Sequence, residues 1–119
     1  MSDLYKVKAE LFRTLGHPAR IRILELLAER DRPVHELLAS IDIEQSNLSQ
    51  QLAVLRRAGL VSQRRENGEV RYAASVPAVV ELLRVARMLL VDILHGQQTL
   101  RAELEDATEE PTPQPTRDA

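Results

Sequence analysis

The 119-residue sequence contains no cysteine and no tryptophan, and aromatic residues make up only 3% of it. The absence of cysteine excludes disulfides, thiolate metal sites and cysteine catalysis. Hydrophobic residues still make up 44%, so a core must be built from leucine, valine, isoleucine and alanine, which favours helices over a β-sandwich or barrel. Uncharged apolar runs of about 18 residues are missing, as is a signal-peptide segment. The sequence therefore predicts a cytoplasmic protein without a membrane partner.

The motifs of the common enzyme classes are also missing. The sequence holds no P-loop, no glycine fingerprint for a dinucleotide and no Ser/His/Asp arrangement on strong local motifs. Only four glycines are present. We therefore predict that the protein is not an enzyme.

Charge is unevenly distributed along the chain. Residues 103–119 carry six acidic side chains against one arginine, a net charge of −5, so the other 102 residues carry +3. Five arginines lie within sixteen residues and are accompanied there only by Glu66 and Glu69; they are Arg56, Arg57, Arg64, Arg65 and Arg71. A local basic patch of this kind is typical of phosphate binding, even on an acidic protein. The alternative is a solvated charged hairpin.

Apolar residues three or four positions apart predict the first helices. The first covers residues 4–15, and the second, which Pro18 opens, covers Pro18–Glu29. Residues 31–33 form a break, and a short third helix covers Val34–Ser40. His17, just before the second helix, is interpreted as a capping or packing residue.

The segment 45–60 predicts a helix with two unlike faces. Leu48, Leu52 and Leu55 fall on one stripe, with Ala58 close to it. The opposite face carries hydrogen-bonding groups, one small residue and one guanidinium: Ser46, Ser49, Gln50, Ala53 and Arg57. Such side chains can bind base edges or phosphate, and Gly59 ends the helix. The pattern is typical of a major-groove recognition helix; the alternative is an ordinary solvated helix face.

A hairpin and a long helix complete the chain. Strands are predicted at 61–66 and 69–74, because the intervening Asn67-Gly68 suits a two-residue type I′ turn. The last helix begins near Pro77, runs to about Glu103, and is apolar almost all round. We expect it to be buried against its own domain and a second subunit; the alternative is a central core helix of a monomer. Residues 1–104 are thus predicted to form one domain and 105–119 a disordered acidic, proline-containing tail.

This order of elements predicts a mainly α winged helix-turn-helix with a small two-stranded β-wing. Over residues 4–100 the chain resembles the arsenic-repressor (ArsR/SmtB) family of small bacterial transcription regulators. The resemblance rests on the segment from Leu15 to Leu24, the run 45–52, the segment from Leu55 to Val61, and a wing ending in Tyr72. It implies a homodimer formed through the first and last helices that binds a palindromic double-stranded operator. Most such proteins are repressors released by a metal ion or small-molecule effector.

The resemblance also implies which residues meet DNA. Nearest the base edges would be Gln45, Ser46, Asn47, Ser49 and Gln50. Arg56 and Arg57, later in the same helix, would contact phosphate. Arg64, Arg65 and Arg71 on the wing would follow the backbone or enter the minor groove.

Two candidate sensor sites follow from the same resemblance. On the short helix, where the family has a thiolate site, His35 and Pro33 take the cysteine positions, and a lone histidine there is more often a surface residue. On the last helix, Glu81, Asp92 and His95 keep metal-capable atoms at family ligand positions, whereas Val79 does not. In an antiparallel pair of helices Glu81 would approach the other two residues of the partner. Such ligands favour Ni, Co, Mn or Zn; the alternative is that they are solvated polar breaks in an apolar helix.

Three functions remain open from the sequence. The first is a ligand- or metal-responsive repressor, and the second an activator or a regulator without a ligand. The third is a winged-helix module that binds another protein and no DNA. A protein-binding wing would carry exposed hydrophobic residues, and this one carries arginine, which favours DNA.

Overall fold

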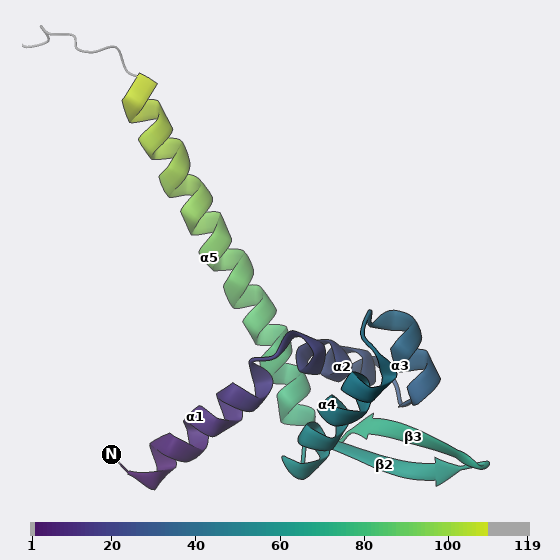
Figure 1. Ribbon diagram of the computed structural model, residues 1–119. Coiled ribbons are helices and arrows are strands. Elements are labelled where there is room, and N and C mark those ends of the chain that lie inside the picture. The colour runs from purple at the N-terminus through teal and green to yellow at the C-terminus, as the bar shows by residue number, and fades with distance from the viewer. Residues whose placement is uncertain (1, 110–119) are drawn as a thin grey trace, which may run out of the picture. The chain divides into compact units, whose positions relative to one another are not determined.

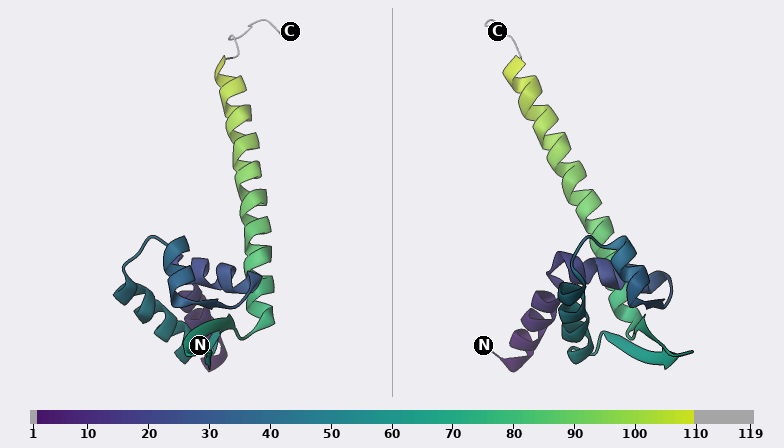
Figure 2. Two further views of the ribbon diagram at one scale, coloured as in Figure 1. Left: turned by 90° about the vertical axis from the view of Figure 1, so that its right-hand side faces the viewer. Right: turned by 45° about the vertical axis from the view of Figure 1, so that its right-hand side comes forward.

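The computed structural model describes residues 2–109 (Figure 1). Its elements in chain order are α1 (Asp3–Leu15), α2 (Pro18–Glu29), β1 (Arg32–Pro33), α3 (Val34–Ser40), α4 (Gln45–Arg57), β2 (Val61–Glu66), β3 (Glu69–Ala74) and α5 (Pro77–Glu109). Helices α2, α3 and α4 gather into one group, from which the β2–β3 hairpin extends (Figure 2). The predicted helices and hairpin are confirmed, and the architecture is a winged helix-turn-helix.

Leucines and isoleucines of α2, α3 and α4 form the core. Ile23 and Leu24 of α2, and Leu37 of α3, are completely buried. The predicted stripe of α4 is buried against them, because Leu48, Leu52 and Leu55 have exposed fractions of 1% or less. Ala58, predicted to lie close to that stripe, is exposed.

The ends of two helices follow from single residues. His17 caps α2, because its Nδ1 accepts a hydrogen bond from the Ala19 amide at 3.1 Å, which confirms the capping interpretation. At the end of α4, Gly59 has φ +80°, its amide donates to Arg56, and the Leu60 amide donates to Leu55. This pair of bonds is the Schellman arrangement, which requires a residue that tolerates positive φ.

The two strands of the predicted wing are confirmed, and a third strand, β1, joins them in one sheet. The order is β1-β3-β2, with both pairings antiparallel. Residues 32 and 33, predicted to be a break, pair with Tyr72 and Arg71 of β3. Pro33 restricts the backbone to extended conformations and lacks an amide donor, so it is tolerated on an edge strand. The turn between β2 and β3 is as predicted, with positive φ at both Asn67 (54°) and Gly68 (77°).

The chain separates within α5 into two compact units, one ending at Leu83 and the other beginning at Arg84. In the first unit, Val79 is buried and Leu82 and Leu83 pack against the core. The helix continues to Glu109, past the expected end near Glu103, so residues 105–109 are helical where a tail was predicted. The first helix-breaking proline beyond them is Pro111, which explains why α5 can extend that far. Residues 110–119 of the predicted tail lie outside the described part.

Large apolar side chains are exposed on the first and last helices of this single chain. On α1, Leu4, Val7 and Phe12 are 59–65% exposed, and only Leu15 is buried. On α5, the exposed set is Val85, Met88, Leu89, Leu90, Val91, Ile93, Leu94, Leu100 and Leu104. Despite this apolar surface, none of the helices within residues 2–109 is long and apolar enough to cross a membrane.

Candidate DNA-binding surface

Helix α4 presents a polar surface on the side opposite its buried leucines. Gln45, Ser46, Ser49 and Gln50 are exposed, whereas Asn47 is half-buried. Four of the five residues predicted to face bases are therefore open to solvent. Half-buried Ala53 follows them and carries no side chain beyond Cβ that would keep the helix away from a groove.

Asn47 differs from its neighbours because its side chain is already bonded inside the protein. Its Oδ1 accepts a hydrogen bond from Gln51 Nε2 at 2.9 Å. Gln51 is only 8% exposed, and its Oε1 accepts from Arg20 Nε of α2 at 2.8 Å. Neither the burial of Gln51 nor its contact with Arg20 was predicted from the sequence. The only signal was a glutamine at the edge of a leucine stripe.

Arg56 and Arg57 lie in the last turn of α4 and are exposed. Together with Ala53 they line a shallow hollow whose other wall is the beginning of β2, formed by Val61, Ser62 and Gln63. Within residues 2–109, neither arginine has a hydrogen bond or ion pair. Both guanidinium groups are therefore available to an external anion.

The wing arginines have different environments. Arg64 donates to the Asp31 carboxylate at 2.5 Å and lies 3.6 Å from Glu66. The hydrogen bond to Asp31 raises the pKa of Arg64 further above the usual guanidinium value, so the side chain stays charged. Arg65, in contrast, is exposed, and among the described residues it donates only to the Gly68 carbonyl, at 3.3 Å.

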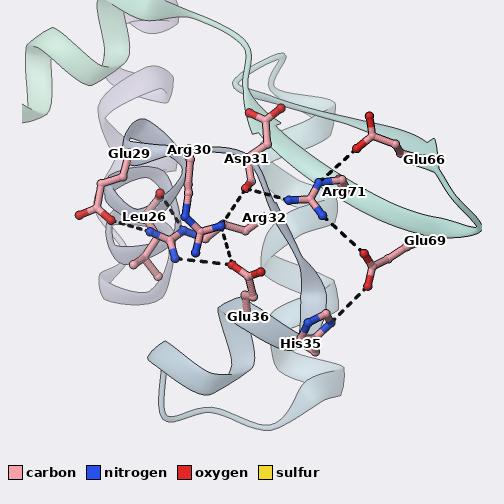
Figure 3. A network of polar contacts seen from close by, with 10 residues as sticks. All are labelled: Leu26, Glu29, Arg30, Asp31, Arg32, His35, Glu36, Glu66, Glu69 and Arg71. Carbon is pink, nitrogen blue, oxygen red and sulfur yellow. Dashed lines mark hydrogen bonds and ion pairs between the residues drawn. The ribbon is translucent and has the colours of Figure 1, made fainter.

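Arg71, the third residue of β3, lies between acidic groups of the wing and the Asp31 backbone (Figure 3). It lies 3.7 Å from Glu66 and 3.5 Å from Glu69, and it donates to the Asp31 carbonyl at 3.4 Å. Its side chain is 23% exposed, about half the fraction of Arg64. Among residues 2–109, the five arginines predicted to contact DNA thus divide into three without acidic partners and two, Arg64 and Arg71, that pair with carboxylates.

Arg32 of β1 contacts α2 through its side chain and pairs with β3 of the wing. It is 8% exposed, donates to the Leu26 carbonyl at 3.0 Å, and pairs with Glu29 at 2.5 Å (Figure 3). A buried cation requires such partners. The adjacent Asp31 is the residue that contacts Arg64 and Arg71. Neither role was predicted from the sequence, in which residues 31–33 had been interpreted as a simple break.

The candidate metal residues are all on α5. Glu81, Asp92 and His95 are exposed, and Asp92 and His95 lie three residues apart on one side of the helix. Nowhere in residues 2–109 do three or more acidic or histidine side chains of one chain gather around a common point. His35 lies 3.4 Å from Glu69 of the wing. It belongs to no group of three metal-capable side chains in the described part of the chain.

A helix with a buried apolar face and an exposed face of serine and glutamine, followed by an arginine-bearing hairpin, defines a winged-helix DNA-binding protein. The family model "Bacterial regulatory protein, arsR family" matches residues 17–63. The HTH-type transcriptional regulator Rv0081 of Mycobacterium tuberculosis is 56% identical over 102 residues, which is 85% of this chain and 90% of that protein. The chain therefore belongs to the ArsR family of bacterial transcriptional regulators.

Other similar proteins have named activities. A biofilm growth-associated repressor of Agrobacterium fabrum is 44% identical over 75 residues, which are 63% of this chain and 64% of that protein. The transcriptional activator HlyU of Vibrio cholerae is 41% identical over 76 residues, which are 61% of this chain and 70% of that protein. The names of these two relatives both describe regulators, while the direction of regulation differs between them.

Solved structures agree with the fold. The crystal structure of Rv0081 matches with a TM-score of 0.77 at 56% identity and covers 82% of this chain and 98% of that one. The homodimeric winged helix-turn-helix DNA-binding domain of Mb0332 from Mycobacterium bovis, solved by NMR, matches with a TM-score of 0.70 at 26% identity. That match covers 79% of this chain and 87% of the domain.

Proposed function

We propose that the protein binds a palindromic operator as a homodimer, with the exposed face of α4 in the major groove and the wing beside the phosphate backbone. One observation carries this proposal: the same helix that is anchored by Leu48, Leu52 and Leu55 exposes serine and glutamine side chains on its free side. These side chains can both donate and accept hydrogen bonds at base edges. The residues assigned to bases are Gln45, Ser46, Asn47, Ser49 and Gln50.

Replacement of Gln50 by alanine is expected to cost about 1–3 kcal/mol of binding free energy at one base pair of the operator. The reason is that a glutamine amide can contact adenine through two hydrogen bonds, which alanine cannot replace. Binding isotherms on duplexes changed one base pair at a time measure this effect. Gln98→Ala, at an exposed position of α5, is the control. An equal loss on every duplex would show that Gln50 does not read a base.

The phosphate contacts are assigned first to Arg56, Arg57 and Arg65, because their guanidinium groups have no acidic partner within residues 2–109. Arg64 and Arg71 can also reach DNA, but each must first exchange a carboxylate for a phosphate. Their net contribution to affinity is therefore expected to be smaller.

Arg57→Ala is expected to weaken binding to all sequences alike and to lower the slope of log K against log salt by about 0.9 per protomer, because one phosphate contact is lost. Arg65→Ala should behave in the same way. Arg71→Ala is the matched comparison, and its slope should change by less, since that arginine is already neutralised by Glu66 and Glu69. Fluorescence anisotropy at several salt concentrations measures all three slopes. Equal slopes for Arg57→Ala and Arg71→Ala would contradict the assignment of the main phosphate contacts to the arginines without acidic partners.

The homodimer is supported by the apolar residues left exposed on α1 and α5 of the single chain. Exposed patches of this extent mark interaction surfaces. A two-fold dimer would present two α4 helices to half-sites about one helical turn, or a multiple of it, apart. The homodimeric domain of Mb0332 shares this fold.

We propose repression as the direction of regulation, in line with the Agrobacterium relative that is named a repressor. A repressor lowers transcription by occupying a site that overlaps its promoter. A reporter driven by the promoter of this gene, with and without the protein, tests the direction. Increased transcription would instead assign the activator role that the Vibrio relative carries.

The metal site stays a prediction that requires a second protomer. Glu81, Asp92 and His95 are exposed on α5 and supply two carboxylates and one imidazole, which suits Ni, Co, Mn or Zn. Calorimetric titration of metal-free protein with these ions is expected to give heat that is lost in Glu81→Ala and in His95→Ala. No heat, or unchanged heat in both variants, removes the site.

A further inference from the structure

A chain of hydrogen bonds joins α1, α2 and the recognition helix. Arg20 of α2 donates through Nη1 to the Thr14 carbonyl in the last turn of α1 at 3.1 Å, and through Nε to Gln51 Oε1 at 2.8 Å. Gln51 in turn donates through Nε2 to Asn47 Oδ1 at 2.9 Å. Gln51 is buried, whereas Asn47 is half-buried and lies in the first turn of α4.

The direction of every bond in this chain follows from Arg20. A guanidinium group has donors only, so Gln51 must turn its amide oxygen toward it. The amide nitrogen of Gln51 is then directed to Asn47, which must present its own oxygen inward. The Asn47 amide nitrogen carries two N–H donors, and no group within residues 2–109 accepts a hydrogen bond from it.

Burial fixes the orientations of the Gln51 and Asn47 side-chain amides. Gln51 is 8% exposed, and a reversed amide would place its nitrogen against the arginine and leave a polar group unsatisfied. Arg20 cannot turn away either, because it is held by acceptors on two different helices. The half-buried Asn47 therefore keeps one fixed polarity, which its exposed neighbours Ser46 and Gln50 do not have.

We infer that Arg20 and Gln51 are positioning residues that make Asn47 an obligatory hydrogen-bond donor toward DNA. The ligand is an acceptor atom of the duplex, either on a base edge (purine N7, guanine O6 or thymine O4) or on a phosphate. This inference rests on the proposed function and adds that one position of α4 distinguishes acceptors from donors. The serine hydroxyls and the glutamine amides nearby can adapt to both.

Two different substitutions should reverse this polarity. In Asn47→Asp the side chain still accepts from Gln51 but offers only oxygen to DNA. In Gln51→Glu the carboxylate accepts from Arg20 and from Asn47, so the asparagine must turn its nitrogen inward and its oxygen outward. Gln63→Glu, at an exposed position of β2 beside Arg56 and Arg57, adds the same charge without touching the chain of bonds.

The experiment selects binding sites from a pool of random duplexes with the wild-type protein and with each variant. Affinities for the wild-type site are then measured, after thermal unfolding has confirmed that each variant is folded. Asn47→Asp and Gln51→Glu are expected to bind that site roughly tenfold or more weakly than Gln63→Glu does. If the acceptor is on a base, both should select adenine or cytosine, which offer amino donors in the major groove, at the same position. If it is a phosphate, the selected bases stay the same, and one methylphosphonate in the site removes the difference between wild type and both variants.

Either of these results supports the donor assignment. Two variants that match Gln63→Glu in both affinity and selected sequence would overturn it, even though the protein binds DNA. A wild-type protein that enriches no sequence would overturn the proposed function itself.

Discussion

The double substitution Leu89→Glu and Ile93→Glu in α5 is expected to give a folded monomer that binds operator DNA at least about a hundredfold more weakly than the wild type. Leu89 is 57% and Ile93 45% exposed in the single chain, so neither is needed for the core of its own protomer. Charges placed at a subunit interface must be desolvated when the second copy binds, which strongly opposes dimer formation. DNA affinity falls because each half-site is then bound separately.

Sedimentation velocity measures the oligomeric state, and anisotropy with a duplex that carries two half-sites measures the affinity. The control is Gln97→Glu with Gln98→Glu, which adds the same charge to polar, exposed positions of the same helix. We expect it to remain a dimer. A wild-type protein that is monomeric at micromolar concentration, or a Leu89/Ile93 variant that remains dimeric, would contradict the assigned interface.

Replacement of Leu48 by alanine is expected to lower the free energy of unfolding by about 2–5 kcal/mol. Leu48 is completely buried in the first half of α4, so its removal leaves a cavity in the core. A loss of this size is a large fraction of the 5–15 kcal/mol that typically stabilises a domain. DNA affinity should also fall, because the position of α4 depends on this packing.

Ser49→Ala, one residue further along, is the matched comparison. Ser49 is exposed and is assigned to DNA, so its removal should reduce operator binding without lowering stability. Urea unfolding at one fixed protein concentration compares the two variants, because the stability of a dimer depends on concentration. Equal stability of Leu48→Ala and Ser49→Ala would show that the leucine stripe does not anchor the helix.

The exposed arginines and the paired arginines show what charge patterning alone can predict. Five arginines within sixteen residues predict a basic surface, but this pattern does not distinguish one arginine from another. Asp31, which pairs with Arg64, is 33 residues away in sequence. A pairing at that distance depends on how β1 and the wing come together, and no local pattern reports it.

Short-range sequence patterns were sufficient to predict the main helices and the hairpin of this protein. The spacing of Leu48, Leu52 and Leu55 placed the buried face of α4 and thereby its polar face. Asn67 and Gly68 set the turn of the wing because few residues adopt positive φ. These features depend on backbone geometry and on side chains a few residues apart, so the sequence alone was sufficient to predict them.

The tertiary structure decided what depends on contacts between distant segments. It made residues 32 and 33 a third strand, because their extended backbone meets β3. It also decided the direction of the Asn47 side chain, which follows from Arg20 through Gln51. Arg20 and Gln51 are 31 residues apart, and their hydrogen bond forms only after the helices have packed. The sequence pattern therefore could not reveal it.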